Sequence, residues 1–176
     1  PDGFRFSLKA PRYATSRRQL AEAGEAVERF LGPVLALGDR LGPINWQLPA
    51  TKRFDRDDIA AFLALLPRER DGRPLRHALE VRHPSFDDPA FFDLAQAHGV
   101  AIVRAGDSPH PRIEADTADF TYARIMGTEV DEALGYSPAA LDRWARTARQ
   151  WAGSGDVWLF VIGGAKARNP AAALAL

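Results

Sequence analysis

Several segments of this chain alternate apolar and polar residues with the period of a β-strand, and helix-like spacers separate most of them. The pattern is clearest in 4–9, 44–48, 79–82 and 121–125. Because successive side chains of a strand point to opposite faces, each of these strands has one apolar and one polar face. Strands that alternate with helices predict a parallel sheet covered by helices. An open parallel sheet is buried on both faces, so the polar face favours a closed barrel whose interior gathers polar groups at one mouth.

Six strands are predicted in all, and capping signals place helices between most of them. The predicted strands are 3–9, 44–48, 77–82, 100–104, 120–125 and 157–162. Four helices are expected to begin at Asp55, Asp88-Pro89, Ser137-Pro138 and Asn169-Pro170. Ser16-Arg17-Arg18-Gln19 fits a capping box for a further helix that runs to about Leu41 and breaks in two at Gly32-Pro33.

Length and composition limit the possible classes of protein. The 176 residues predict one domain, and an apolar fraction of 46% is enough to build a core. The formal net charge of zero argues against a protein whose main task is to coat nucleic acid. The absence of cysteine excludes disulfides and thiolate chemistry, and it fits a cytoplasmic protein. No apolar run approaches the roughly 18 residues of a membrane span, so no membrane partner is expected.

The strongest candidates for a functional site lie at the C-terminal ends of the predicted strands, where TIM barrels carry their sites. Strand alternation lets five of these side chains point inward together: Lys9, Gln47, Glu80, Arg82 and Arg124. Three cations around one carboxylate hold Glu80 ionised and leave surplus positive charge. The simplest use of that surplus is a small anionic ligand, a phosphate or a carboxylate held by arginine forks. The competing interpretation is a salt-bridge network that only fills the barrel.

Individual residues of this set have more than one possible role. Glu80 is the candidate catalytic residue, as a general base, and a structural partner of Arg82 or Arg124 is the alternative. Tyr122 is a candidate ligand-binding residue that orients Arg124. His83 leaves its strand before a proline and is expected at the rim, either binding the ligand or bonded to the backbone. No metal site is predicted, because no cluster of His, Asp and Glu surrounds Glu80, and no cofactor is implied.

Three other features have weaker functional interpretations. The basic stretch from Lys9 to Arg18 could contact a nucleic-acid backbone, but a solvated loop is favoured. Gly163-Gly164-Ala165-Lys166 could bind phosphate, although it lacks the spacing of a Walker motif and a plain connection is favoured. The histidines His77, His98 and His110 are expected to be structural or solvated.

Five motifs in chain order carry a resemblance to a known family. They are 1–9, 41–49, 79–86, 122–127 and Tyr136. Together they cover nearly the whole chain, and they resemble the YecE-like family, a bacterial and archaeal domain of unknown function (domain of unknown function 72). The resemblance implies a TIM-type (β/α) barrel in which the six strands are the third to the eighth. It also implies that the single domain of residues 1–176 lacks the first two strand–helix units of the family.

The chain departs from the family at three places near the predicted mouth. The family commonly has Thr-His where this chain has Thr15-Ser16, and Arg-x-His-Gly where it has Arg124-Ile125-Met126-Gly127. The last strand of the family usually ends in asparagine-rich polar residues, whereas this one runs into Gly163-Gly164. Two histidines and an amide are therefore absent from the expected mouth.

Three functions follow as hypotheses. The first is an enzyme that acts on a small phosphate- or carboxylate-bearing ligand at the C-terminal mouth of the barrel. The second is a nucleic-acid-processing or nucleic-acid-binding barrel, which the zero net charge disfavours. The third is a degenerate, non-catalytic barrel fragment, which the departures at Ser16, Met126 and Gly163 favour.

Overall fold

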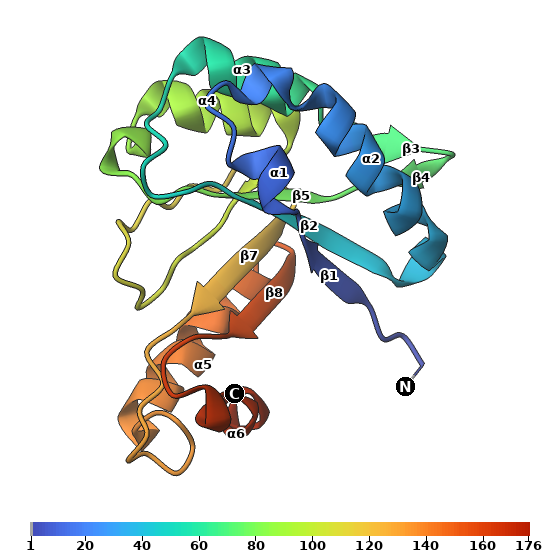
Figure 1. Ribbon diagram of the computed structural model, residues 1–176. Helices are drawn as coiled ribbons and strands as arrows, with labels where there is room; N and C mark the ends of the chain where they lie inside the picture. Colours follow the sequence, from blue (N-terminus) through green and yellow to red (C-terminus); the bar gives the residue numbers. More distant parts are fainter. Residues whose placement is uncertain (1) are drawn as a thin grey trace.

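Parallel strands covered by helices form a mixed α/β fold in the computed structural model, which describes residues 2–176 (Figure 1). The strands are β1 (Phe6–Lys9), β2 (Leu41–Gln47), β5 (His77–Glu80), β6 (Ala101–Ile102), β7 (Phe120–Ile125) and β8 (Asp156–Val161). The first four form one parallel sheet in the order β1-β2-β5-β6, and β7 pairs with β8 in a second parallel sheet. One parallel bridge between Arg104 and Ala123 joins the two sheets. The predicted parallel pairing of strands that follow one another in the chain is confirmed.

The helices lie mainly on the outer side of the strands (Figure 1). They are α1 (Arg12–Thr15), α2 (Gly24–Val34), α3 (Arg56–Ala64), α4 (Pro89–His98), α5 (Pro138–Ala152) and α6 (Asn169–Ala175), with 3-10 helices η1 (Leu20–Ala23), η2 (Leu35–Arg40), η3 (Pro84–Phe86) and η4 (Lys166–Arg168). Three predicted caps are confirmed, because the side chains of Asp55, Asp88 and Ser137 each accept a backbone N–H from the first turn that follows. No helix within residues 2–176 is both long and apolar enough to cross a membrane.

The helical region after β1 differs from the prediction. The short helix α1 begins directly after Pro11, and Ser16 is its C-cap, with its backbone N–H donated to the carbonyl of Arg12. Ser16 therefore does not begin a new helix as predicted. Pro33 is tolerated in the last turn of α2, and the predicted break at Gly32-Pro33 is wrong. The chain turns instead at Gly38, whose φ of 53° is a left-handed conformation that glycine adopts without steric cost.

A small antiparallel hairpin, β3 (Glu69–Arg70) and β4 (Arg73–Pro74), precedes β5 and is absent from the sequence prediction. Its turn is Asp71-Gly72, and both residues have positive φ, at 54° and 73°. Two positive φ values define the turn type that Asp-Gly dipeptides favour. This dipeptide is the signal from which the hairpin could have been predicted.

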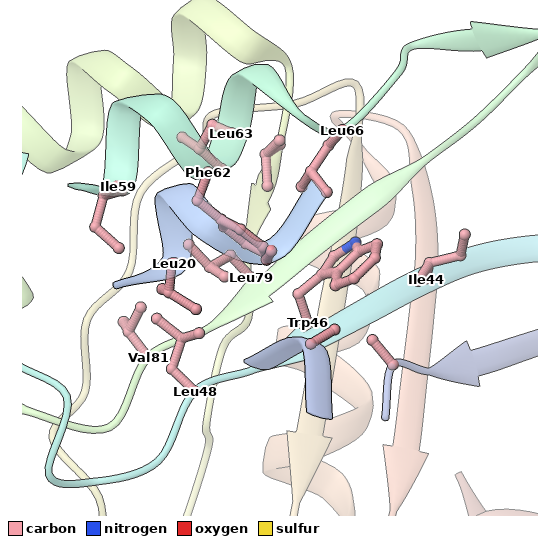
Figure 2. Close-up of a cluster of buried hydrophobic side chains, with 14 of the residues drawn as sticks. Leu20, Ile44, Trp46, Leu48, Ile59, Phe62, Leu63, Leu66, Leu79 and Val81 are labelled. Carbon is pink, nitrogen blue, oxygen red and sulfur yellow. The ribbon is translucent and has the colours of Figure 1, made fainter. Parts of the chain in front are cut away.

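The outer, apolar face of the first sheet packs on the helices and forms the largest core. Trp46 of β2 is fully buried and makes edge contacts with Phe62 of α3 and Phe30 of α2, each at 5.7 Å between ring centroids. Figure 2 shows leucine, isoleucine and valine side chains from strands and helices around the same indole. Because Trp46 points to the helices, the alternation of β2 sends its neighbours Asn45 and Gln47 to the opposite face.

The inner face carries a smaller apolar cluster below the polar groups. It is formed by Ala78, Ala101, Val103, Phe120 and Tyr122, and Ala118, Trp158 and Phe160 pack against it. Side chains of the two sheets meet across the inner space. The hydroxyls of Ser7 and Tyr122 lie 3.0 Å apart, and a Cβ at Gly42 would lie 2.6 Å from the Trp158 ring. The inner faces of the two sheets therefore face each other. A third cluster packs the outer face of β7 and β8 under α5 and α6.

Candidate functional site

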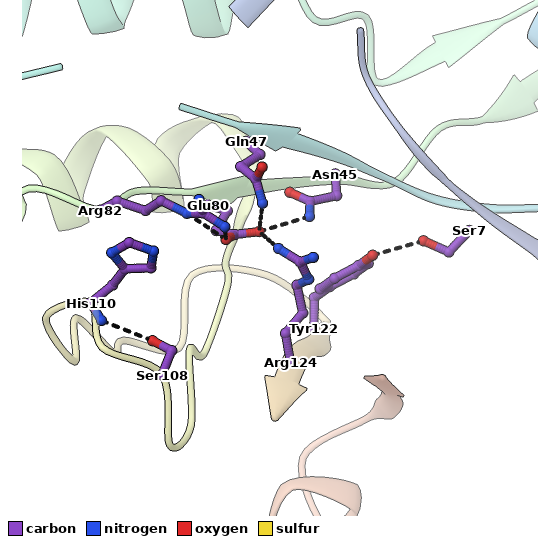
Figure 3. Close-up of polar contacts among 9 residues, drawn as sticks. All are labelled: Ser7, Asn45, Gln47, Glu80, Arg82, Ser108, His110, Tyr122 and Arg124. Atoms are coloured by element: carbon purple, nitrogen blue, oxygen red, sulfur yellow. Dashed lines mark hydrogen bonds and ion pairs between the residues drawn. The ribbon is translucent and has the colours of Figure 1, made fainter. Parts of the chain in front are cut away.

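Glu80 is the centre of a polar cluster at the C-terminal ends of the strands (Figure 3). Its side chain is 1% exposed. Oε2 accepts hydrogen bonds from Asn45 Nδ2 at 3.0 Å and Gln47 Nε2 at 2.8 Å, and it also receives Arg124 Nη1. Oε1 accepts both Nε and Nη2 of Arg82, at 2.9 and 2.7 Å. Both carboxylate oxygens are therefore fully engaged by protein donors.

The register of the strands explains why these side chains meet. Gln47 and Glu80 are paired residues of β2 and β5, and Lys9 of β1 is paired with Asn45. Arg124 comes from β7 and reaches across the inner space to Glu80. Of the five residues predicted to point inward together, Gln47, Arg82 and Arg124 each contact Glu80. Lys9 is exposed and lines the neighbouring cavity instead.

The charges around Glu80 keep it ionised. Burial raises the pKa of this carboxyl, but Arg124, the hydrogen bonds from Gln47 and Asn45, and Arg82 act in the opposite direction. Their combined effect is larger, and the pKa of Glu80 is lowered. A carboxylate with a lowered pKa and no free lone pair is well suited to hold two arginines in place.

A cavity of about 340 Å³ opens beside this cluster and is rich in cations. Lys9, Arg12, Ser16, Gln47 and Arg82 contribute to its lining. Neither Lys9 nor Arg12 has a carboxylate within ion-pair distance among residues 2–176. The cavity therefore presents more positive than negative charge to whatever enters it.

Tyr122 is buried in the inner space, and its hydroxyl contacts Ser7 rather than Arg124. The predicted role of orienting Arg124 through a hydrogen bond is therefore not seen. Ser7 donates its hydroxyl proton to the carbonyl of Pro43 at 2.8 Å, so the Tyr122 hydroxyl donates to Ser7. Its ring stacks on Phe160 with centroids 5.0 Å apart. Burial raises the pKa of Tyr122, against smaller lowering effects of Ser7, Arg124 and Asn45. The phenol therefore stays protonated.

His83 follows β5 and holds a loop, which is the backbone-bonded role expected for it as one of two alternatives. Its Nδ1 accepts the backbone N–H of Ser85 at 3.1 Å and lies 2.8 Å from the Ser85 hydroxyl. That hydroxyl accepts the backbone N–H of Phe54 at 2.8 Å. The imidazole thus caps η3 and ties two loops together.

Two residues of the cluster were not among the predicted site residues: Asn45 was not singled out, and His110 was expected to be structural or solvated. Asn45 is 1% exposed, donates to Glu80, and its Oδ1 has no hydrogen-bond partner among the described residues. Its position two residues before Gln47 on the polar face of the same strand was the available signal. His110 belongs to the loop between β6 and β7, and its ring lies beside Arg82 at the edge of the cluster (Figure 3). Nothing in the local sequence around His110 indicates this placement, which depends on the path of a long loop.

Two of the positions that differ from the family pattern, Ser16 and Met126, lie next to the cavity and to the end of β7. Ser16 lines the cation-rich cavity, so the substitution changes the wall of the site itself. The backbone N–H of Met126 donates to Asp107 at 2.5 Å, and the Tyr136 hydroxyl donates to the same carboxylate at 2.8 Å. These bonds tie the β6–β7 loop to the end of β7.

The glycine-rich segment after β8 is held by protein groups. Ala165 donates its backbone N–H to the carbonyl of Thr128 at 2.8 Å, and the Thr128 hydroxyl contacts Asn169. Gly163 and Gly164 have φ of 75° and 49°, which allows this tight turn. A plain connection accounts for the segment. No group of three or more His, Asp or Glu side chains in the part of the chain described is placed to hold a metal ion.

These observations define a parallel α/β protein with a cation-rich, carboxylate-anchored cluster at the C-terminal ends of its strands. The chain belongs to the family described as "Protein of unknown function DUF72", which matches residues 1–176, so the predicted relationship to the YecE-like family is confirmed. No curated protein matches the chain.

Solved structures of the same family are similar in fold. A DUF72 family protein of Thermotoga maritima is 22% identical, with 98% of this chain and 73% of that chain covered and a TM-score of 0.72. A DUF72 family protein of Enterococcus faecalis is 14% identical, with 99% and 77% covered and a TM-score of 0.76. At these identities the similarity concerns the fold.

Proposed function

We propose that this protein binds a small anionic ligand, bearing phosphate or carboxylate, in the cation-rich cavity at the C-terminal ends of its strands. The observation that carries the proposal is the charge balance of the mouth. Glu80 is the one carboxylate in the cluster, and its oxygens are already occupied by Arg82, Arg124 and two amides. Lys9 and Arg12 line the cavity without a carboxylate of their own, so an incoming anion supplies the charge that this wall lacks.

Glu80 acts in this proposal as the anchor of the site. Its carboxylate holds Nε and Nη2 of Arg82 in place, so the guanidinium is already ordered before a ligand arrives. Less conformational entropy is then lost when the ligand binds. Its predicted role as a general base stays a prediction. A lowered pKa and occupied oxygens weigh against that role, because a base needs a free lone pair near the proton it removes.

The architecture proposed for the site is a TIM-type barrel in which the six parallel strands take the third to the eighth places. Three contacts between the two sheets support it: Ser7 with Tyr122, Gly42 with Trp158, and Glu80 with Arg124. Helices on the outside and polar groups at the C-terminal strand ends are the arrangement that TIM barrels use for their sites.

The test is calorimetric titration of inorganic phosphate and of acetate into the wild type and into Lys9→Met and Arg82→Met. Each substitution is expected to weaken anion binding by about tenfold or more, the scale of a lost charged hydrogen bond. Arg149→Met is the matched control. It lies in the last turn of α5, whose C-terminus leads into β8, and so at the opposite end of the strands from the mouth. Unchanged affinity in both mouth variants, or tight binding of a divalent cation by the wild type, contradicts the proposal.

One observation favours a second candidate function, the binding of nucleic acid. A neighbouring cavity of about 560 Å³ is lined by Arg17, Arg18, Lys52 and Arg53, and it shares Ser16 and Pro49 with the mouth cavity. Lys52 is already paired with Asp58 at 2.5 Å, which reduces the free charge. Binding of a single-stranded oligonucleotide, with an affinity that falls steeply with salt and is lost in Arg17→Met/Arg18→Met, supports this candidate over the first.

A further inference from the structure

The loop between β6 and β7 delivers a histidine to the mouth. His110 is half-buried, and its imidazole lies near the guanidinium of Arg82, at the edge of the cluster around Glu80 (Figure 3). The loop is tied at both ends. Asp107 accepts the backbone N–H of Met126 and the hydroxyl of Tyr136, and Thr117 donates its hydroxyl to the carbonyl of Val100 at 2.7 Å. These bonds hold the two ends of the loop, and the backbone N–H of His110 donates to the hydroxyl of Ser108 at 3.2 Å.

The charges that surround His110 come from two strands and from its own loop. Glu80 is the last residue of β5, Arg82 lies two residues after it, and Arg124 lies on β7. On the loop itself, Arg112 and Arg104 share Glu114, at 3.2 and 3.5 Å, and Arg104 also pairs with Asp116, so these two arginines and two carboxylates balance. Burial lowers the pKa of His110, and Arg82 and Arg124 lower it further, while Glu80 acts in the opposite direction. The free imidazole is therefore neutral at neutral pH, in a site that already has surplus positive charge.

A ligand with two negative charges offsets more of this surplus than a monoanion does. Lys9, Arg12, Arg82 and Arg124 against Glu80 leave three positive charges at the mouth, of which a dianion neutralises two and a carboxylate monoanion one. Once a dianion is bound, the field at His110 favours the imidazolium, because an opposite charge within about 4–6 Å stabilises the charged form. The imidazolium then donates an additional charged hydrogen bond to the ligand.

We propose that the mouth site selects a dianionic group, such as a phosphomonoester, and that His110 contacts this group as an imidazolium. The inference rests on the proposed function and narrows its ligand from anions in general to dianions. Binding must then take up a proton at His110. By linkage, the affinity rises as the pH falls, by up to about tenfold per pH unit where the free imidazole is neutral and the bound one is charged.

Sulfate is the suitable probe, because it stays dianionic between about pH 5.5 and about pH 8 and any proton taken up comes to the protein. Sulfate is titrated calorimetrically into the wild type in two buffers of different ionisation enthalpy. The observed heat is expected to differ between the buffers by an amount that corresponds to uptake of up to one proton. Sulfate is also expected to bind about tenfold or more tightly than acetate.

The variant that tests the residue is His110→Gln, which keeps the backbone N–H bond to Ser108. In this variant the heat should be the same in both buffers, and sulfate should bind with an affinity that no longer depends on pH. His98→Gln, at the end of α4, is the matched control and should behave as the wild type. An NMR titration of the His110 ring in the wild type, expected to show a higher pKa with sulfate than without, reports on the same coupling without a substitution.

The outcomes separate this inference from the proposed function. Sulfate binding with buffer-independent heat, coupling that persists in His110→Gln, or acetate binding as tight as sulfate overturns the inference and leaves the anion site intact. Absence of any sulfate or phosphate binding overturns both.

Discussion

The two ends of the parallel strands each carry arginines around a cavity, of about 330 Å³ at the N-terminal end and about 340 Å³ at the C-terminal end. At the N-terminal end Arg76 is paired with Asp156 at 2.5 Å and lies 3.5 Å from Asp119, and Arg73 is paired with Asp39 at 2.8 Å. At the C-terminal end Arg82 and Arg124 share the single carboxylate of Glu80. Arg5 also lines the N-terminal cavity, where three arginines thus face Asp39, Asp119 and Asp156. The N-terminal end is therefore balanced in charge, whereas the mouth carries surplus positive charge.

This difference is the basis for the proposal that the C-terminal end binds a ligand, while the N-terminal end serves the fold. Arginines with their own carboxylates stabilise the surface and need no further partner. Arginines that share one buried carboxylate are held rigidly and still carry surplus charge. The same division is general in TIM barrels, where the C-terminal face holds the site and the N-terminal face contributes to stability.

The largest effect is expected for Glu80→Gln, which leaves Arg82 and Arg124 partly buried without their counter-ion. Removal of one member of a buried pair costs about 3–5 kcal/mol of the free energy of unfolding, measured by urea denaturation. Asp156→Asn removes a carboxylate from an exposed pair at the other end, and a change within about 1 kcal/mol is expected. If Glu80→Gln and Asp156→Asn lower the free energy of unfolding by the same amount, the two ends do not differ in how their arginines depend on a carboxylate.

The next effect concerns pH and the buried imidazole at the start of β5. Trp46 Nε1 donates to His77 Nδ1 at 3.0 Å, and burial lowers the pKa of His77 from 6.5 to about 4, against a raising effect of the Pro67 carbonyl. The unfolded chain therefore binds more protons between these two pH values. The free energy of unfolding should fall by about 3 kcal/mol as the pH drops from 6.5 to 4. Below pH 4 His77 is protonated in both the folded and the unfolded chain, so it causes no further loss.

His77→Asn keeps an acceptor for Trp46 and removes the titrating group. The wild type and the variant are compared by urea denaturation across the same pH range. A smaller pH slope is expected in the variant, and an identical slope would show that other groups cause it.

A medium effect is expected for Gly42→Ala, which tests the close approach of β2 and β8 at the N-terminal end. The new Cβ would lie 2.6 Å from the Trp158 ring and 3.1 Å from the carbonyl of Phe6, so the strands must separate. A loss of about 1–3 kcal/mol is expected by thermal or urea unfolding. Gly32→Ala, in α2 with no atom within 4 Å of the new Cβ, should instead stabilise by about 0.5–1 kcal/mol. Tolerance of both substitutions contradicts the contact between the sheets.

The smallest effect is expected for Arg76→Met. The substitution removes two exposed ion pairs and a cation–π contact with Phe120 at 5.3 Å, which together amount to about 1 kcal/mol of the free energy of unfolding. Anion affinity, measured by calorimetry, should stay unchanged. A loss of anion binding as large as that of Arg82→Met would place the ligand at the wrong end of the strands.

The order and pairing of the strands could be predicted from the sequence because period-two alternation and helix caps are local signals. Phe120–Ile125 was predicted with its observed bounds, and the caps Asp55, Asp88 and Ser137 are confirmed. The region after β1 could not be predicted as well. Four residues fitted a capping box at Ser16, but the packing of Leu20 and Ala23 into the core selects a short 3-10 helix there.

The site was predictable where it depends on strand alternation and not where it depends on loops. Gln47, Glu80, Arg82 and Arg124 meet because parallel strands end at one edge and the inner faces oppose each other. The side chain of His83 caps the 3-10 helix η3, which begins at the proline that follows it. His110 approaches Arg82 through the loop of 17 residues between β6 and β7 (103–119), whose path depends on tertiary contacts at Asp107 and Thr117.

The most direct test of the difference between the two ends is a crystal soaked in selenate, a dianion whose selenium gives an anomalous signal. The account predicts an anomalous peak in the mouth cavity, within hydrogen-bond distance of Arg82 and Lys9, and none in the cavity lined by Arg73 and Arg76. A peak beside Arg76, or selenate at neither end at concentrations that saturate an anion site, would contradict it.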